Sequence, residues 1–219
     1  MKILIIIPTY NAEQTIEQLL DEVEKYVSQE NILVVNDGSI DSTIEKISKK
    51  NIAIIHHQKN LGKGAALQTG FDFALQKKYE AVITLDADLQ HPPKYIPEFL
   101  QKYYDNNYDI IIGNRLHNTQ GMPFHRKLSN TITTFLVKLK TGVNVFDSQS
   151  GYRFIHRKVL EKIHLSSSGF EAETELLLKA VKQKYTFGAV NIPTIYNGEK
   201  SNMKNFSTTI NFIKILLKY

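Results

Sequence analysis

Residues 81–91 have the sequence AVITLDADLQH, and this stretch decides the fold. Its first half is apolar, and an apolar run of this length predicts a buried β-strand. Asp86 and Asp88 follow at the carboxyl end of that strand, where open α/β sheets bind ligands. Because residues two apart in an extended backbone point the same way, we expect both carboxylates on one face. A divalent cation shared with substrate phosphates would relieve their repulsion, whereas the alternative is a loop in which Asp88 only caps a helix.

The first hundred residues repeat this alternation of short apolar runs and helical patterns. Such an alternation predicts βαβ units in an α/β fold, with a Rossmann-like, mainly parallel central sheet flanked by helices. The expected strands cover residues 3–7, 32–35, 52–55, 81–85, 109–113 and 152–156, with a further strand end at 190–193. Among the expected helices are those at residues 63–75, 94–104, 126–140, 171–183 and 206–219.

Two of these helices are basic and amphipathic. The helix at residues 126–140 places Leu128, Ile132, Phe135, Leu136 and Leu139 at helical spacing. We expect this apolar stripe to pack in the core, although a helix lying on a bilayer has the same pattern. The C-terminal helix places Phe206, Ile210, Ile213, Leu216 and Leu217 on one side.

Charge and composition limit the classes of function. The chain has 219 residues, a net charge of +5 and no cysteine, which excludes disulfides and thiolate metal sites. No apolar stretch reaches the roughly 20 residues of a membrane-spanning helix. Residues 110–146 and 200–219 contain basic side chains but no acidic ones. These segments predict a surface for anionic lipid or phosphate, with a merely solvated basic face as the alternative.

Three charged residues at other segment ends could bind a phosphorylated ligand. Asp37 ends the second strand, where an acid can accept hydrogen bonds from a ribose or a base, although an aspartate before glycine is also common in turns. Lys63 lies between two glycines at a helix start, which indicates a phosphate contact without the spacing of a Walker A loop. Arg115 follows the fifth strand, and its guanidinium could hold a diphosphate bidentately.

Taken in order, the motifs resemble family 2 glycosyltransferases of the GT-A fold. They are PTYN at 8–11, VVNDGS at 34–39, NLGKG at 60–64 and DADLQH at 86–91. The segment DSQSGYR at 147–153 resembles the branch of dolichyl-phosphate mannosyltransferase and its bacterial polyprenyl-phosphate relatives. On this resemblance we expect a glycosyltransferase domain over 1–204 and a membrane-associated basic helix over 205–219.

The resemblance implies an inverting, metal-dependent enzyme that moves one sugar from GDP-mannose or a UDP-hexose to a dolichyl or undecaprenyl phosphate. It implies Mg²⁺ or Mn²⁺ bound by Asp86, Asp88 and Gln90. Residues implied near the nucleotide sugar are Pro8, Tyr10, Asp37, Lys63, Asp86, Ala87 and Lys200. Arg115, Arg126 and Ser129 would face the acceptor phosphate, and Asp88, Arg115 and Arg126 would be the catalytic residues. Ala12 departs from the family pattern, which usually has a glutamate there.

The implied partners are the donor, the lipid acceptor, the cytoplasmic face of a membrane and a possible membrane protein; nucleic acid is not expected. A phosphate acceptor is already an anion, so its attack needs cations rather than a strong base. Two alternatives remain. A sugar-hydroxyl acceptor would need a base, for which Glu171, Glu173 or Glu175 could serve, although acids also favour a helix N-terminus. A nucleotide-binding module without turnover is the other.

Overall fold

One mixed β-sheet organises the molecule. The computed structural model describes residues 1–193, 195 and 205–219, with side chains in the last range from residue 209. Within these residues seven strands form one sheet in the order β3-β2-β1-β4-β6-β5-β7. The strands are β1 (Ile3–Thr9), β2 (Ile32–Asn36), β3 (Ala53–His56), β4 (Ala81–Thr84), β5 (Ile110–Asn114), β6 (Arg153–His156) and β7 (Phe187–Asn191). Only β6 is antiparallel to its neighbours, β4 and β5, so the predicted mainly parallel sheet is confirmed.

The central strands are apolar over most of their length because both faces of the sheet are covered. Along β1, Leu4 and Ile6 pack into one core cluster, whereas Ile5 and Ile7 pack into the other. Successive side chains of a strand point to opposite faces, so a strand buried on both faces needs apolar residues at every position.

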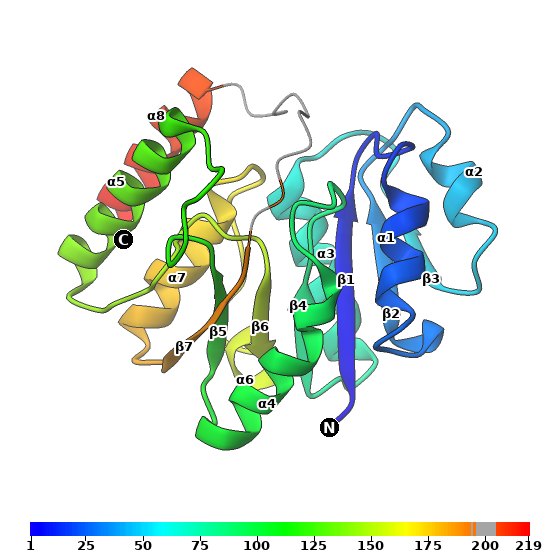
Figure 1. The fold of residues 1–219 in the computed structure, drawn as a ribbon, viewed down its shortest axis with the longest axis horizontal. Helices are drawn as coiled ribbons and strands as arrows, with labels where there is room; N and C mark the ends of the chain where they lie inside the picture. The colour runs from blue at the N-terminus through cyan, green and yellow to red at the C-terminus, as the bar shows by residue number, and fades with distance from the viewer. Residues whose placement is uncertain (194, 196–204) are drawn as a thin grey trace.

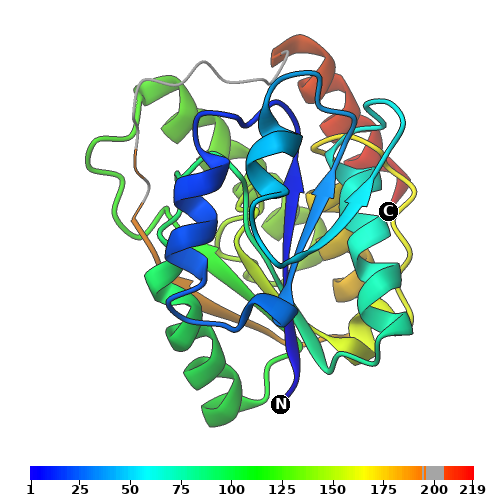
Figure 2. The same cartoon turned by 90° about the vertical axis from the view of Figure 1, so that its right-hand side faces the viewer.

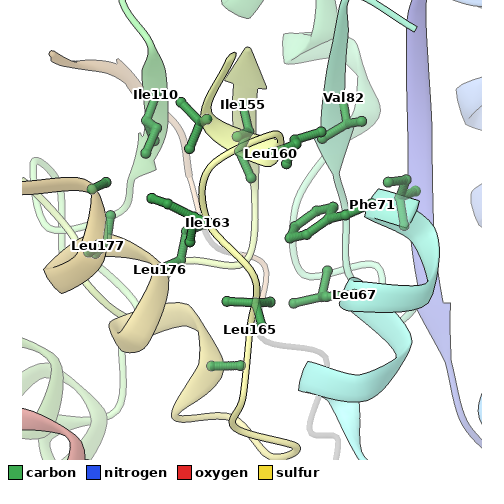
Figure 3. Packing of buried hydrophobic residues seen from close by; sticks show 14 of the residues in the cluster. Leu67, Phe71, Val82, Ile110, Ile155, Leu160, Ile163, Leu165, Leu176 and Leu177 are labelled. Atoms are coloured by element: carbon green, nitrogen blue, oxygen red, sulfur yellow. The ribbon is translucent and has the colours of Figure 1, made fainter. Parts of the chain in front are cut away.

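Helices cover both faces of the sheet (Figures 1 and 2). The face of Ile5 is covered by α1 (Ile16–Val23), α2 (Thr43–Ile47) and α4 (Ile96–Asn106). The opposite face is covered by α3 (Lys63–Gln76), α6 (Arg157–Leu160), α7 (Ala172–Lys182) and α8 (Asn205–Lys218). Figure 3 shows that core, where Phe71 of α3, Ile155 of β6 and Leu176 of α7 lie around one interior. Short 3-10 turns at Gln29–Asn31 and Pro93–Tyr95 precede β2 and α4.

Helix α5 (Phe124–Thr141) does not pack as its sequence pattern predicted. Leu128, Ile132, Phe135 and Leu139 are between 48% and 69% exposed, so their predicted core packing is wrong. The helix contacts α7 and turns Thr134 and Val137 inward, together with the partly buried Leu136. The wide apolar surface of α5 is therefore divided, and its larger part faces outward.

The apolar side chains of helix α8 are likewise split between a buried side and an exposed side. Phe212 and Ile215 are buried in the core, whereas Ile210, Ile213 and Leu217 are exposed. Both α5 and α8 pack on α7, and both lie at the left-hand end of the molecule in Figure 1. Among the described residues, no helix is long and apolar enough to cross a membrane.

Candidate active site

The acidic stretch lies at the carboxyl edge of the sheet, where β1, β2 and β4 end side by side. Strand β4 ends at Thr84, and Ala87 and Asp88 form a turn, so the extended geometry expected for the two aspartates does not continue through them. Leu89 has a positive φ of 57°, and the Asp88 carboxylate accepts a hydrogen bond of 3.0 Å from the backbone N–H of Gln90. No helix begins at Asp88, which rules out the alternative of a helix cap.

Lys63 connects the acidic stretch to helix α7. Its ammonium lies 2.5 Å from Asp86 Oδ1 and 2.7 Å from Glu173 Oε1. Burial lowers the pKa of Lys63, but the two carboxylates outweigh it and hold that pKa above its usual range. Burial likewise raises the pKa of Asp86, and Lys63 outweighs it in the opposite direction. The three side chains therefore form a charged network at the sheet edge, with Asp86 its most exposed member.

Gly151, between the short loop 147–150 and β6, makes room for this network. A Cβ atom at Gly151 would lie 2.4 Å from Asp86 Oδ2 and 2.8 Å from both Lys63 Nζ and Glu173 Oε1. Distances this short are not available to real Cβ atoms. A side chain at this position would therefore displace at least one of the three charged side chains that gather against its backbone.

The glycines around Lys63 serve packing rather than an open helix N-terminus. The backbone N–H of Gly64 donates to the Ser168 carbonyl at 2.7 Å, and a Cβ atom at Gly62 would lie 2.3 Å from the same oxygen. Because this carbonyl covers the first turn of α3, that turn presents no phosphate cradle, and the predicted Lys63 phosphate contact would have to come from its side chain.

Asp37 is buried at the end of β2 and shapes the loop before α3. Its carboxylate accepts hydrogen bonds from the backbone N–H groups of Leu61 at 2.9 Å and Gly62 at 2.7 Å. His57 Nδ1 lies 2.7 Å from the same carboxylate. Asp37 thus fixes the backbone that positions Lys63, and its contact with a nucleotide stays a prediction.

Arg115 reaches the same edge from β5 and forms a buried pair with Asp147. Its Nε and Nη2 donate to the two carboxylate oxygens at 2.6 and 2.9 Å. Burial raises the pKa of Asp147, and Arg115 outweighs that effect and lowers it. This bidentate pair fixes the guanidinium plane, so Arg115 is held in one orientation beside the acidic stretch.

The remaining predicted residues lie on several different elements. Pro8 is buried in β1, Tyr10 is 39% exposed after it, and the Ala87 carbonyl accepts a 2.6 Å hydrogen bond from Thr15. Arg126 and Ser129 lie in the first turns of α5, with Ser129 exposed. Lys200 lies outside the described residues.

Sequence reasoning gave no role to Arg153, although it belongs to the segment DSQSGYR. Its guanidinium is buried and donates to the backbone carbonyls of Ser148, Ser150 and Glu173 at 2.7 to 2.9 Å. It thereby ties loop 147–150 to the start of α7. The sequence contains one indication of this role, because Arg153 comes directly before the apolar pair Phe154 and Ile155 of a strand. A charged side chain is expected at such a buried position only if it is fully paired.

His91 is a buried neighbour of the acidic stretch. Its ring stacks on Tyr152 with centroids 6.2 Å apart, and burial, aided by Arg115, lowers its pKa to about 4. The imidazole is therefore neutral at pH 7.

The edge as a whole presents oxygen atoms suited to a hard cation. Asp86, Asp88 and Gln90 are all partly exposed within five residues of chain. In the described part of the chain, no three His, Cys, Asp or Glu side chains gather in a way that could hold a metal, so any cation here would use two carboxylates and other oxygens.

Comparisons with known proteins bear on this geometry. A sequence model of glycosyl transferase family 2 matches residues 4–164. The UDP-N-acetylglucosamine–dolichyl-phosphate N-acetylglucosaminyltransferase of Methanococcus voltae is 32% identical over 96% of this chain and 92% of its own. The polyprenol monophosphomannose synthase of Mycolicibacterium smegmatis is 31% identical over 93% of this chain and 80% of its own.

Solved structures extend the comparison to the fold. Glucosyl-3-phosphoglycerate synthase from Mycobacterium tuberculosis, solved with Mn²⁺ and UDP-glucose, superposes with a TM-score of 0.79. The match covers 99% of this chain and 78% of the other at 17% sequence identity. A likeness at this identity concerns the arrangement of strands and helices.

Proposed function

Because this chain belongs to glycosyltransferase family 2 and has the GT-A fold, we propose that it moves one sugar from a nucleotide-sugar donor to a polyprenyl phosphate, with inversion. The family match makes the chain a glycosyltransferase. The observation that carries the finer proposal is the edge where Asp86, two residues before Asp88, pairs with Lys63 and interacts electrostatically with Arg115. Anionic and cationic groups are both needed there, because a metal ion and two phosphates must be held together.

The residues present fit a divalent cation, Mg²⁺ or Mn²⁺. Carboxylate and amide oxygens are hard donors, and Asp86, Asp88 and Gln90 supply them at a partly exposed position. A bound cation would supply charge stabilisation for the leaving nucleotide diphosphate. The Mn²⁺ seen with UDP-glucose in the structurally similar synthase supports this choice. The donor would be GDP-mannose or a UDP-hexose, lying near Pro8, Tyr10, Asp37, Lys63 and Ala87.

A phosphate acceptor is favoured by the relatives' names and by the charges. One relative is named for transfer to dolichyl phosphate and the other for a polyprenol monophosphomannose product. Arg115, Arg126 and Ser129 would hold the acceptor phosphate, with the fixed guanidinium of Arg115 orienting it for in-line attack. An acceptor that is already an anion needs no strong base.

The competing acceptor, a sugar hydroxyl, would need such a base. Glu173 was a candidate, but its carboxylate lies 2.7 Å from the Lys63 ammonium. The ammonium thus occupies Oε1, one of the two Glu173 oxygens that could accept the proton of a sugar hydroxyl. The geometry therefore favours the phosphate acceptor.

A lipid acceptor requires a membrane surface, and the apolar faces of α5 and α8 are suited to one. We define the apolar face of α5 by Phe124, Leu128, Ile132, Phe135 and Leu139, which are all exposed. His125, Arg126, Lys127, Lys138 and Lys140 occupy the same helix, and it contains no acid. Apolar and basic side chains on one exposed helix are typical of binding to anionic lipid. Residues 205–219 would assist, at the cytoplasmic face of a membrane and with a possible membrane-protein partner.

A transfer assay tests the proposal. The protein is incubated with Mn²⁺, a short polyprenyl phosphate in detergent, and radiolabelled GDP-mannose, UDP-glucose or UDP-N-acetylglucosamine in separate reactions. We expect one donor to label the lipid, with loss of labelling in the presence of EDTA and in Asp88→Asn. Absence of labelled lipid with every donor would count decisively against the proposal.

A further inference from the structure

Lys63 bridges two carboxylates that differ in how firmly they are held. Asp86 belongs to the loop after β4, and its side chain is 22% exposed. The Glu173 side chain is 6% exposed, and its backbone carbonyl is held by Arg153 Nη1 at 2.7 Å. Glu173 is therefore fixed in the interior, whereas Asp86 faces the open edge.

A cation bound at Asp86 Oδ1 would come close to the Lys63 ammonium. Oδ1 carries the Lys63 ammonium at 2.5 Å, whereas Oδ2 faces the space left by the missing side chain of Gly151. A divalent cation bound to Oδ1 would repel the ammonium on the same oxygen, and this repulsion favours displacement of the ammonium. The displaced charge would be costly in this buried position unless a second carboxylate kept it.

We propose that Glu173 is a positioning residue that retains the Lys63 ammonium when a divalent cation takes its place at Asp86. The inference rests on the proposed function, because it requires the cation at Asp86. With Glu173 as its anchor, Lys63 exchanges one partner and keeps the other, and the ammonium stays beside the cation. There it would contact the donor diphosphate, whose charge would replace that of Asp86.

This exchange makes Lys63 a competitor of the metal, and Glu173 sets the strength of the competition. In Glu173→Gln, Asp86 is the one carboxylate left to Lys63 in this network, so the ammonium holds Asp86 more firmly. Mn²⁺ should then bind more weakly. Removing the ammonium as well, in Lys63→Met/Glu173→Gln, should restore Mn²⁺ binding, which a general disturbance of the site would not do.

Calorimetric titration of the full chain with Mn²⁺ alone, and with Mn²⁺ in the presence of UDP or GDP, tests the exchange. We expect Glu173→Gln to bind Mn²⁺ about tenfold more weakly than the parent, as for one charge-assisted hydrogen bond. Glu173→Asp, which keeps the charge but shortens the side chain, should also bind more weakly. The double variant should regain most of the affinity, and Glu161→Gln, which removes a carboxylate paired with Arg157, should match the parent.

The outcomes separate this inference from the proposed function. Unchanged Mn²⁺ affinity in Glu173→Gln, or a double variant no better than Glu173→Gln, overturns the exchange while the proposed function stands. A parent protein that binds no Mn²⁺, with or without a nucleotide, overturns both.

Discussion

Gly151 is the residue whose missing side chain allows the charged network to form. Replacing it with alanine would place a Cβ atom 2.4 Å from Asp86 Oδ2, so Asp86 and Lys63 would have to move. We expect Gly151→Ala to lose most Mn²⁺-dependent nucleotide binding and about 1–3 kcal/mol of unfolding free energy through overpacking. Calorimetry and urea unfolding measure the two effects. Gly142→Asn, at the left-handed C-cap of α5, is the control: a Cβ atom there would have no neighbour within 4 Å, and the variant should retain nucleotide binding.

The buried pair of Arg115 and Asp147 should contribute more to folding than an exposed pair. Asp147→Asn removes the charge of the carboxylate that both Nε and Nη2 of the buried Arg115 contact. We expect a loss of about 3–5 kcal/mol in unfolding free energy, measured by urea denaturation. Glu161→Gln removes an exposed i,i+4 pair with Arg157 and should cost no more than about 0.5 kcal/mol. Equal losses in the two variants would contradict this account of Asp147.

At the residue scale, the sequence predicted positions better than partners. Asp37, Asp86 and Arg115 lie at strand ends as expected, because the end of an apolar run is visible in the sequence. The contact of Lys63 with Glu173 was not predictable, since it joins residues 110 positions apart that meet only through the packing of α3 on α7.

Helix α5 presents its largest apolar side chains to the outside, and this face should bind lipid. We expect Phe135→Gln/Leu139→Gln to reduce co-sedimentation with vesicles of phosphatidylglycerol and phosphatidylcholine at least about tenfold, because each apolar side chain contributes about 1.5–3 kcal/mol when fully buried. Unfolding free energy should change by no more than about 0.5 kcal/mol.

A matched variant lies on the opposite side of the same helix. Val137 is buried against the core, so Val137→Ala should lower the unfolding free energy while leaving vesicle binding unchanged. Vesicle binding by Phe135→Gln/Leu139→Gln at the parent level would show that the apolar face of α5 does not meet lipid. The sequence could not decide this point, because core packing and lipid binding require the same amphipathic pattern.

Glu175 links helix α7 to Tyr219, which follows α8, and to the loop that precedes α7. Because these contacts use its carboxylate, they are sensitive to pH. Its buried carboxylate accepts hydrogen bonds from Ser166, Ser167 and the Tyr219 hydroxyl. Burial raises the pKa of Glu175, but Lys179 and the two serines outweigh it and lower the pKa from 4.5 to about 2. A carboxyl whose pKa is depressed by folding stabilises the protein above its unfolded pKa and loses that contribution as pH falls to the folded value.

The unfolding free energy should therefore fall between pH 4.5 and about 2, with Glu175 contributing to the fall. In Glu175→Gln the dependence on pH over this window should be weaker, and stability at pH 7 should be lower by about 1–3 kcal/mol. Urea unfolding at a series of pH values measures both effects. A parallel pH dependence in the parent and the variant would contradict the role assigned to Glu175.

For the whole molecule, the sequence predicted the α/β class and the main strands, because short apolar runs alternate with amphipathic helices. It did not predict that β6 is inserted antiparallel between β4 and β5. That arrangement carries Arg153 and Gly151 to the carboxyl edge, because the amino end of an antiparallel strand lies beside the carboxyl ends of its neighbours. Strand order depends on packing between distant segments, which the local pattern of one sequence does not record.

The central claim is that this edge transfers a sugar to a phosphate anion on a lipid. The most direct measurement compares a polyprenyl phosphate with the polyprenol of the same length, each incubated with the parent protein, Mn²⁺ and the labelled donor that the protein accepts. We predict label in the polyprenyl phosphate alone, with none when Asp88→Asn replaces the parent. Equal labelling of the polyprenol, or undiminished transfer by Asp88→Asn, would contradict the account.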